Sequence, residues 1–350
     1  MYGSQLESIS HDIGERCYHM GNEDKLIISK KVNLASPKAG AEIIDVSDDF
    51  FAKCDRMLND SDPIFIDDKY DNHGKWMDGW ESRRKRVEGN DWAIIGLGGK
   101  CSIKEVIIDT SHFTGNYPPA ASLDFSSNNK YEKESMDWHT LLEKQTLKGD
   151  HVNEFKLLKN ENVTYVRLNI YPDGGVARLR LLGDLIPFSQ DLSKEIELSA
   201  LKNGGKIIGY NNAHYGNVNA LLSEGRGTTM GDGWETRRRR VPGNDFIIIE
   251  LGKPGHISNV ELDTCHFKGN FPDRASIQTI DLRNEKDKLK AFETSSDWEF
   301  FLGEKKCKAD SIHNFGKDDF LHEKMVSHVR LNIYPDGGVS RFRIFGQPIS

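Results

Sequence analysis

The sequence predicts an all-β protein built from two jelly-roll β-sandwich domains in tandem. Three observations support this fold class. Short runs rich in β-branched residues alternate with Gly, Pro and Asn turn signals along the whole chain. Helices of about a dozen residues, which a doubly wound α/β fold needs for its crossovers, are missing. The order of runs and motifs occurs twice, which indicates a duplicated domain.

The bulk composition is that of a globular protein. The chain has 350 residues, 37% hydrophobic and 29% charged, which is enough for two domains with cores. Its net charge of -7 argues against a nucleic-acid partner. No segment has about 18 consecutive apolar residues and no signal-like core is visible, so we expect no membrane partner and a cytoplasmic location. Five cysteines without metal-like spacing suit a reducing compartment.

We divide the chain into four parts from these patterns. Residues 1–24 are polar and aperiodic, and we expect a flexible arm or an interface strap there. Residues 25–184 form the first jelly-roll repeat, 185–196 the linker and 197–350 the second repeat.

The first repeat is expected to contain several short strands and few helices. Acidic residues ahead of Phe51 suggest a short helical turn at 47–51. Two runs separated by Gly-Gly-Lys suggest a pair of adjacent antiparallel strands, and a Pro-Asp-Gly-Gly turn at 172–175 suggests a closing hairpin. The expected strands are 41–46, 92–97, 105–109, 121–125, 165–171 and 176–182.

The second half repeats this order with loops of different length. Residues 198–222 match 34–58, and residues 263–272 match 109–118. Surface connections drift in length while a core does not, so the changing offsets place insertions in loops between matched strands.

The first repeated motif is a dense polar block at 78–91 and again at 232–245. Each copy begins Asp-Gly-Trp-Glu and continues into two arginines. The glutamate suits a general base or a holder of an amidino group, and the planar guanidinium suits a two-pronged clasp on a carboxylate. The tryptophan suits a pocket wall or a core edge, and an ion-paired structural network is the alternative for each residue. The candidates are Asp78, Trp80, Glu81, Arg83, Arg84, Asp232, Trp234, Glu235, Arg237 and Arg238.

The second repeated motif, Asp-Thr-x-His-Phe-x-Gly-Asn, follows a predicted strand in each half. Its histidine titrates near neutrality and suits proton transfer or metal binding, with the aspartate orienting the ring or ligating beside it. A histidine hydrogen-bonded inside a loop is the alternative. His214 stands opposite Phe50 and marks a difference between the halves. The candidates are Asp109, His112, Asn116, Asp263, His266 and Asn270, and a divalent metal would use the Asp and His residues.

Taken together, these motifs resemble the allantoicase family over nearly the whole chain. The resemblance rests on both Asp-Gly-Trp-Glu blocks, on residues 109–116, on Leu34-Ala-Ser-Pro, on residues 47–52 and on both Tyr-Pro-Asp-Gly-Gly turns. Ser82 stands where the family usually has threonine. The resemblance implies a repeated jelly roll, similar to discoidin and carbohydrate-binding modules. It also implies hydrolysis of allantoate to ureidoglycolate and urea, and assembly into a homo-oligomer.

The resemblance further implies roles for the candidates. Arg237 and Arg238, or their first-repeat counterparts, would clasp the carboxylate of allantoate. Glu235 or Glu81 would hold the departing urea or activate water, and His266 or His112 would carry a proton. A non-catalytic module that binds a carbohydrate or a small acid is the competing interpretation, and a pseudoenzyme that retains the fold is a third.

Overall fold

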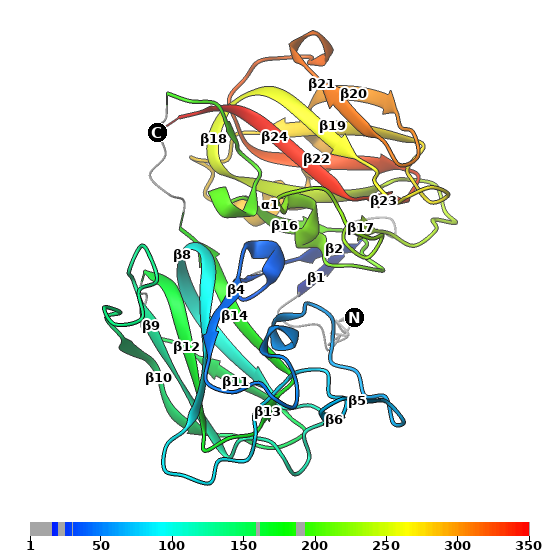
Figure 1. Ribbon diagram of the computed structural model, residues 1–350. Coiled ribbons are helices and arrows are strands. Elements are labelled where there is room, and N and C mark those ends of the chain that lie inside the picture. Colours follow the sequence, from blue (N-terminus) through cyan, green and yellow to red (C-terminus); the bar gives the residue numbers. More distant parts are fainter. Residues whose placement is uncertain (1–15, 20–24, 30, 159–161, 187–192, 350) are drawn as a thin grey trace, which may run out of the picture.

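The protein consists of two β-sandwiches (Figure 1). This computed structural model describes residues 16–19, 25–29, 31–158, 162–186 and 193–349. Both sandwiches are antiparallel throughout, so the predicted fold class is confirmed. Within these ranges no helix has the length and apolar character needed to cross a membrane.

The first repeat carries twelve strands and two short 3-10 helices. The strands are β3 (Val32–Asn33), β4 (Glu42–Val46), β5 (Tyr70–Asp71), β6 (Gly74–Lys75), β7 (Trp80–Glu81), β8 (Asp91–Asp109), β9 (Ala120–Ser126), β10 (His139–Thr146), β11 (Val152–Lys156), β12 (Val163–Tyr171), β13 (Gly175–Val176) and β14 (Arg178–Leu185). The helices are η1 (Pro37–Ala39) and η2 (Cys54–Leu58).

The second repeat follows the same order, except that the described residues form no counterpart of the β5–β6 pair and that α1, η5 and η6 are added. Its strands are β15 (Ile196–Glu197), β16 (Lys206–Tyr210), β17 (Trp234–Glu235), β18 (Asp245–Asp263), β19 (Arg274–Ile280), β20 (Glu299–Lys306), β21 (Ile312–Phe315), β22 (Val326–Tyr334), β23 (Gly338–Val339) and β24 (Arg341–Pro348). Its helices are η3 (Leu201–Asn203), η4 (Val218–Leu222), α1 (Lys288–Glu293), η5 (Ser295–Asp297) and η6 (Lys317–Asp319).

The long strand β8 organises the first repeat, and β18 does the same in the second. The first half of β8 pairs with β12 and β4, and its second half pairs with β14 and β11. The expectation of two separate strands at 92–97 and 105–109 is therefore wrong. Gly98 continues the strand because it lies against η1: a Cβ there would meet the carbonyl oxygen of Ala39 at 1.9 Å.

The predicted closing hairpin is also wrong. β12 and β14 do not pair with each other, because each pairs with a different half of β8. The turn at 172–175 instead crosses between the two groups of strands, and β13 pairs with β7. The helical turn expected at 47–51 lies further on, at η2, because the Ser47 and Asp48 side chains bond to Trp92 and Arg83 rather than to a following helix.

This topology brings the motifs to one end of each sandwich. Asp91 pairs with Ile170, and Asp109 pairs with Arg178. Only the short segment between β12 and β14 separates these two partners, so both ends of β8 lie at the same end of the sandwich. The loops that carry residues 78–91 and 110–119 meet there, and β18 repeats the arrangement through its pairing with β22 and β24.

The N-terminal segment belongs to the sheet of the second repeat. β1 (Arg16–His19) and β2 (Lys25–Ile28) form a hairpin, and β2 pairs with β16. Leu26 is fully buried against Phe246 and Ile248, under α1. Part of the stretch expected to be a flexible arm is thus a strand that crosses to the other repeat; residues 1–15 and 20–24 lie outside the described residues. So do residues 187–192 of the expected linker.

Candidate functional site

The glutamate of each Asp-Gly-Trp-Glu block sits on a two-residue strand that is fixed along both edges. β7 pairs with β13 on one side, where Glu81 faces Gly175, and bridges to Ala52 on the other. β17 pairs with β23 and bridges to Tyr215 in the same way. Backbone bonds on both sides hold the side chain in a defined direction, as a working site requires.

The two motif tryptophans lie in the core. Trp80 and Trp234 are both 0% exposed, and each indole N–H donates at 2.8 Å to a backbone carbonyl, that of Asp48 or Asn212. Both tryptophans therefore pack in the core, which is one of the two positions that the sequence suggested for them. Neither ring is placed to bind substrate. A fully buried ring cannot contact a ligand that arrives from solvent, so their contribution is packing and the positioning of the strand.

Each glutamate is bonded to the asparagine of the second motif. The Asn116 side-chain amide donates to Glu81 Oε1 at 2.7 Å, and Asn270 donates to Glu235 Oε1. The second carboxylate oxygen of both glutamates has no partner among the described residues. Burial raises the pKa of Glu81 and outweighs the Asn116 bond, which lowers it. The structure thus joins the two motifs through a Glu–Asn pair in each repeat.

The first arginine of each block differs between the repeats. Asp48 clasps Arg83 through Nε at 2.7 Å and Nη2 at 2.6 Å, so that guanidinium is neutralised. In the second repeat Asn212 replaces the aspartate, and Arg237 Nε donates to His214 Nδ1 at 2.9 Å instead. Arg237 is exposed and has no carboxylate partner within the described part of the chain.

The second arginine of each block, Arg84 or Arg238, is exposed and takes part in no hydrogen bond or ion pair among the described residues. The two repeats therefore differ at the first arginine, which is paired with a carboxylate in the first repeat and with His214 in the second.

The aspartate that opens each block is a buried ion-pair partner. Asp78 accepts from Arg178 Nη2 at 2.6 Å, and Asp232 accepts from Arg341 Nη2 at 3.0 Å. Burial opposes ionisation of Asp232, but bonds from Lys38 and Arg341 outweigh it and lower its pKa to about 2. Through these ion pairs the two carboxylates hold the loop that precedes the glutamate.

The histidines of the second motif take part in loop contacts. His112 and His266 have positive φ angles of 69° and 70°. Their backbone N–H groups donate to Asp150 and Asp310. A ring Nε2 faces a carbonyl oxygen in each repeat, at 3.2 Å for His112 and 2.9 Å for His266.

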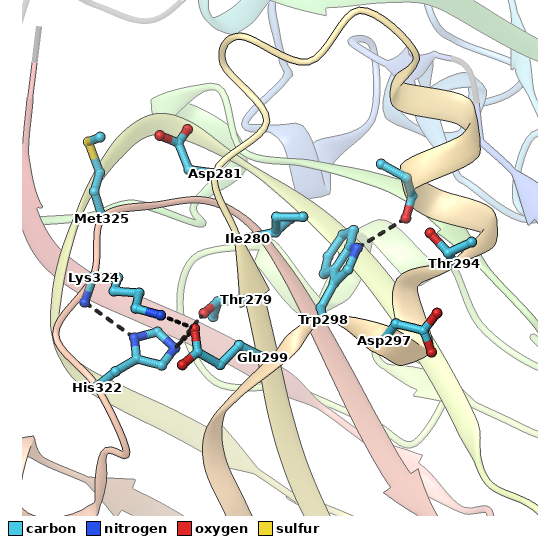
Figure 2. A pocket seen from close by; sticks show the side chains of 11 residues that line it. Thr279, Ile280, Asp281, Thr294, Asp297, Trp298, Glu299, His322, Lys324 and Met325 are labelled. Atoms are coloured by element: carbon cyan, nitrogen blue, oxygen red, sulfur yellow. Dashed lines mark hydrogen bonds and ion pairs between the residues drawn. The ribbon is translucent and has the colours of Figure 1, made fainter.

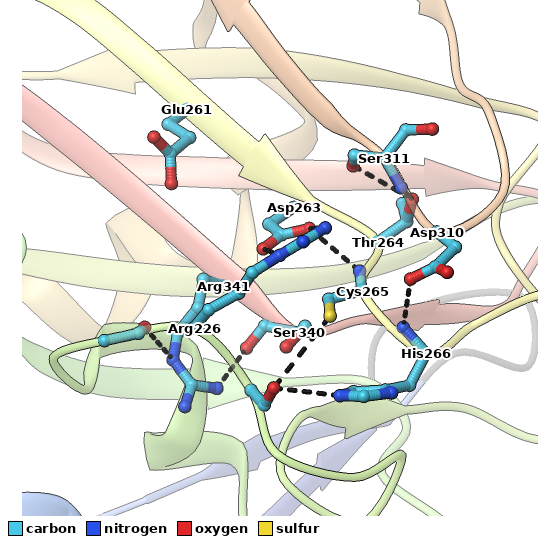
Figure 3. Close-up of polar contacts among 12 residues, drawn as sticks. Arg226, Glu261, Asp263, Thr264, Cys265, His266, Asp310, Ser311, Ser340 and Arg341 are labelled. Carbon is cyan, nitrogen blue, oxygen red and sulfur yellow. Dashed lines mark hydrogen bonds and ion pairs between the residues drawn. The ribbon is translucent and has the colours of Figure 1, made fainter.

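No hydrogen bond joins either histidine to Glu81 or Glu235 among the described residues. Asp263 instead binds Arg226 at 3.0 Å, in the cluster drawn in Figure 3, while Asp109 accepts from the Ser111 N–H at 2.8 Å. Within the described ranges no group of three or more His, Cys, Asp and Glu side chains is placed to hold a metal ion. Each Asp–His pair could supply only two metal ligands, and both side chains are already bonded to other groups. The pairs therefore do not fit a metal site.

Several residues of the site escaped sequence analysis. Asp48 and Asn212 decide the state of the neighbouring arginine, and Arg178, Arg341 and Arg226 hold the motif aspartates. The difference between Phe50 and His214 was visible as a mismatch between the halves. Arg178 could have been found as a charged residue within the expected strand 176–182, and Arg341 as its counterpart in the second repeat, whereas Arg226 lies in a loop and gave no such signal.

A separate pocket of about 480 Å³ lies beside α1 in the second repeat (Figure 2). Figure 2 shows Trp298 on one side and the group of Glu299, His322 and Lys324 on the other. None of the candidate residues lines it, so it is not part of the site built from the repeated motifs.

Comparison with known proteins agrees with this architecture. The model of the allantoicase repeat matches residues 32–186 and again 196–349. A probable allantoicase of Acinetobacter baumannii (strain ACICU) is 46% identical over 321 residues, covering 92% of this chain and 95% of the relative. A probable allantoicase 1 of Burkholderia mallei (strain ATCC 23344) is 47% identical over 318 residues, with 90% and 94% covered.

Solved structures give the same result. The crystal structure of allantoicase from Saccharomyces cerevisiae superposes with a TM-score of 0.77 at 30% identity, covering 95% of this chain and 99% of that one. A second allantoicase structure gives a TM-score of 0.76 at 32% identity, with 90% and 93% covered. The chain belongs to the allantoicase family.

Proposed function

We propose that this enzyme hydrolyses allantoate to ureidoglycolate and urea in the second repeat. The residues proposed to do so are Glu235, Arg237, Arg238 and Asn270, which we call the Glu235 cluster. Family membership supports the reaction, and one observation carries the choice of repeat: Arg237 is exposed and free of a carboxylate, whereas Asp48 clasps Arg83. Allantoate is an anion with two ureido arms on one carbon, so it needs a free cation for its carboxylate. The second repeat offers that cation.

The chemistry divides among four side chains of this cluster. Arg237 and Arg238 bind the carboxylate through planar guanidinium groups. Glu235, with Oε1 held by Asn270, directs Oε2 to the water that attacks the central carbon. The C–N bond to one ureido arm breaks, the water oxygen stays on carbon and the departing nitrogen takes a proton, which gives urea.

His214 adds a hydrogen-bond donor next to this cluster. Its Nδ1 accepts from Arg237 Nε, so the ring is a neutral imidazole with its proton on Nε2. A donor at that position suits a ureido oxygen or the departing nitrogen. It replaces the shuttle role first expected for His266, whose ring faces the carbonyl of Gly227 instead.

An exchange of the residues that differ between the repeats tests this assignment. Asn212→Asp places in the second repeat the carboxylate that neutralises Arg83 in the first. A charged hydrogen bond is worth about 1.5–3 kcal/mol, so the KM for allantoate is expected to rise roughly 10- to 100-fold in a urea-release assay. The matched variant Asp48→Asn is expected to keep the wild-type KM. An unchanged KM in Asn212→Asp would place substrate binding elsewhere.

Two further expectations belong to this proposal. Cys54, Cys101, Cys265 and Cys307 are free and buried, which supports a reducing compartment such as the cytoplasm. A homo-oligomer is supported by exposed apolar side chains in the first repeat, among them Ile64 (53%), Phe65 (48%) and Tyr70 (68%). Light scattering after size-exclusion chromatography measures the mass, and a 39.7 kDa monomer would contradict this part.

The carbohydrate-binding alternative has less support. Sugar sites use exposed aromatic platforms, and the two motif tryptophans are fully buried. Each repeat instead places a Glu–Asn pair and arginines at the open end of the sandwich. That arrangement fits a small ureido acid better than a sugar ring.

A further inference from the structure

A pocket of about 650 Å³ lies where the two repeats meet. The first repeat contributes Lys38 from η1 and Gly98 from β8, and the second contributes the segment around residues 222–232 together with Arg341. Glu235 and Arg237 do not line it. The pocket is therefore separate from the Glu235 cluster, although Asp232 lies three positions before Glu235 in the same motif.

The corresponding space in the first repeat is filled by its own chain. There the long segment between η2 and β7 folds over Arg178, which is 0% exposed and donates to the Ser61 carbonyl at 2.8 Å. The same segment supplies the Ile64 N–H to Asp78 at 3.0 Å. In the second repeat the segment between η4 and β17 is shorter, so this space remains open.

Lys38 of the first repeat reaches across this opening. Its Nζ lies 2.5 Å from Asp232 Oδ1. The counterpart of the Ile64 N–H is the Thr228 N–H, which donates to Asp232 Oδ2 at 3.1 Å, so Lys38 is an additional partner of this carboxylate. Residues of both repeats therefore form the wall of the pocket. Four cationic side chains and two carboxylates line it: Lys38, Lys202, Arg226 and Arg341, with Glu224 and Asp232.

Arg226 is the arginine of the lining with a free N–H edge. Its Nε and Nη2 donate to Asp263 at 3.0 and 3.4 Å, and Nη1 has no partner among the described residues. Asp263 is 1% exposed whereas the Arg226 side chain is 50% exposed, so the buried carboxylate fixes a half-exposed guanidinium in the lining of the pocket. Figure 3 shows the contact between Arg226 and Asp263. A fixed planar fork of this kind suits a carboxylate.

The two carboxylates in the lining restrict the ligand further. Asp232 stays ionised through its bonds to Lys38 and Arg341, and Glu224 pairs with Lys202. These carboxylates can accept N–H groups from a ligand, and a phosphate ion has no N–H group to offer them. The exposed Thr229 adds a hydroxyl on the same wall.

We propose that the pocket between the repeats is a second binding site, which takes a small monocarboxylate carrying N–H donors, of the ureido-acid class. Arg226 binds the carboxylate, and Asp232 and Glu224 accept the ureido N–H groups. Naming ureido acids rests on the proposed function, whereas the location of the site does not.

Calorimetric titration with hydantoate tests this proposal, because hydantoate has one carboxylate and one ureido arm. Thr229→Phe fills the pocket and leaves the Arg226–Asp263 pair intact, and Arg226→Lys keeps the charge but removes the fork. Each change is expected to weaken hydantoate binding at this site by about tenfold or more, or about 1.4 kcal/mol. Inorganic phosphate is expected to bind more weakly than hydantoate.

Arg237→Gln separates this pocket from the candidate active site. Hydantoate binding that persists in Arg237→Gln and is lost when Thr229→Phe is added belongs to the pocket. Absence of saturable binding, or binding lost in Arg237→Gln and kept in both pocket variants, would overturn the second site. Tighter binding of phosphate would overturn the ligand class. Unchanged urea release in Arg237→Gln would count against the active-site assignment alone.

Discussion

Asp232 links the two repeats, and its ionisation is expected to control part of their stability. Burial disfavours its charge, but bonds from Lys38 and Arg341 prevail and lower its pKa from 3.8 to about 2. The Asp232 side chain is 14% exposed, so solvent screening is limited. At roughly 1.4 kcal/mol per pKa unit, the ionised carboxylate contributes about 2 kcal/mol to the free energy of unfolding.

The lowered pKa of Asp232 determines how this contribution to stability changes with pH. The contribution is complete well above pH 3.8 and is lost as the pH falls from 3.8 towards about 2. Between pH 5 and pH 3 the wild type is therefore expected to lose about 1 kcal/mol more than Asp232→Asn, which lacks the titrating group. Urea unfolding at the two pH values measures both losses.

The surface pair of Asp67 and Lys75 provides the control, because the Asp67 side chain is 88% exposed. Asp67→Asn is expected to follow the wild type at both pH values. Equal losses in the wild type and Asp232→Asn would refute the reasoning, since they would mean that the folded protein does not favour the ionised form of Asp232.

Two further predictions test the site and the fold. Arg237→Gln is expected to raise the KM for allantoate by about tenfold or more, because it removes the free guanidinium. Arg83→Gln is expected to have little effect, because Asp48 already binds that guanidinium. Steady-state urea release measures both KM values, and equal effects would contradict the choice of repeat. Gly98→Ala is expected to lower the melting temperature, since its Cβ would lie 1.9 Å from a carbonyl oxygen, whereas Gly99→Ala meets its nearest atom at 3.6 Å and should have a smaller effect in a thermal melt.

Much of the fold could be predicted because local patterns encode it. The strands at 121–125 and 165–171 lie within β9 and β12, and their apolar residues, such as Leu123 and Val166, are buried. The pairing of strands could not be predicted from those patterns. Gly98 and Gly99 look like a turn in the sequence, but tertiary contact with η1 decides that the chain continues as one strand. The 172–175 turn likewise looks like a hairpin until β8 separates the two strands that flank it.

The candidate site was predicted in part. The repeated motifs identify Glu81, Asn116, Glu235 and Asn270, and the structure pairs each glutamate with its asparagine. The sequence did not reveal which charged side chains of the motifs form ion pairs. Ion-pair partners such as Asp48 come from distant segments, and only the fold brings them to the motif.

We propose Glu235 of the second repeat as the general base of the hydrolysis. Urea release from allantoate by Glu235→Gln and Glu81→Gln, measured side by side, tests it most directly because the two residues hold matched positions and matched asparagine partners. Loss of a general base lowers the rate by about 10²- to 10⁴-fold, and this loss is expected in Glu235→Gln while Glu81→Gln retains most of the activity. Full urea release by Glu235→Gln would contradict the proposed role of Glu235.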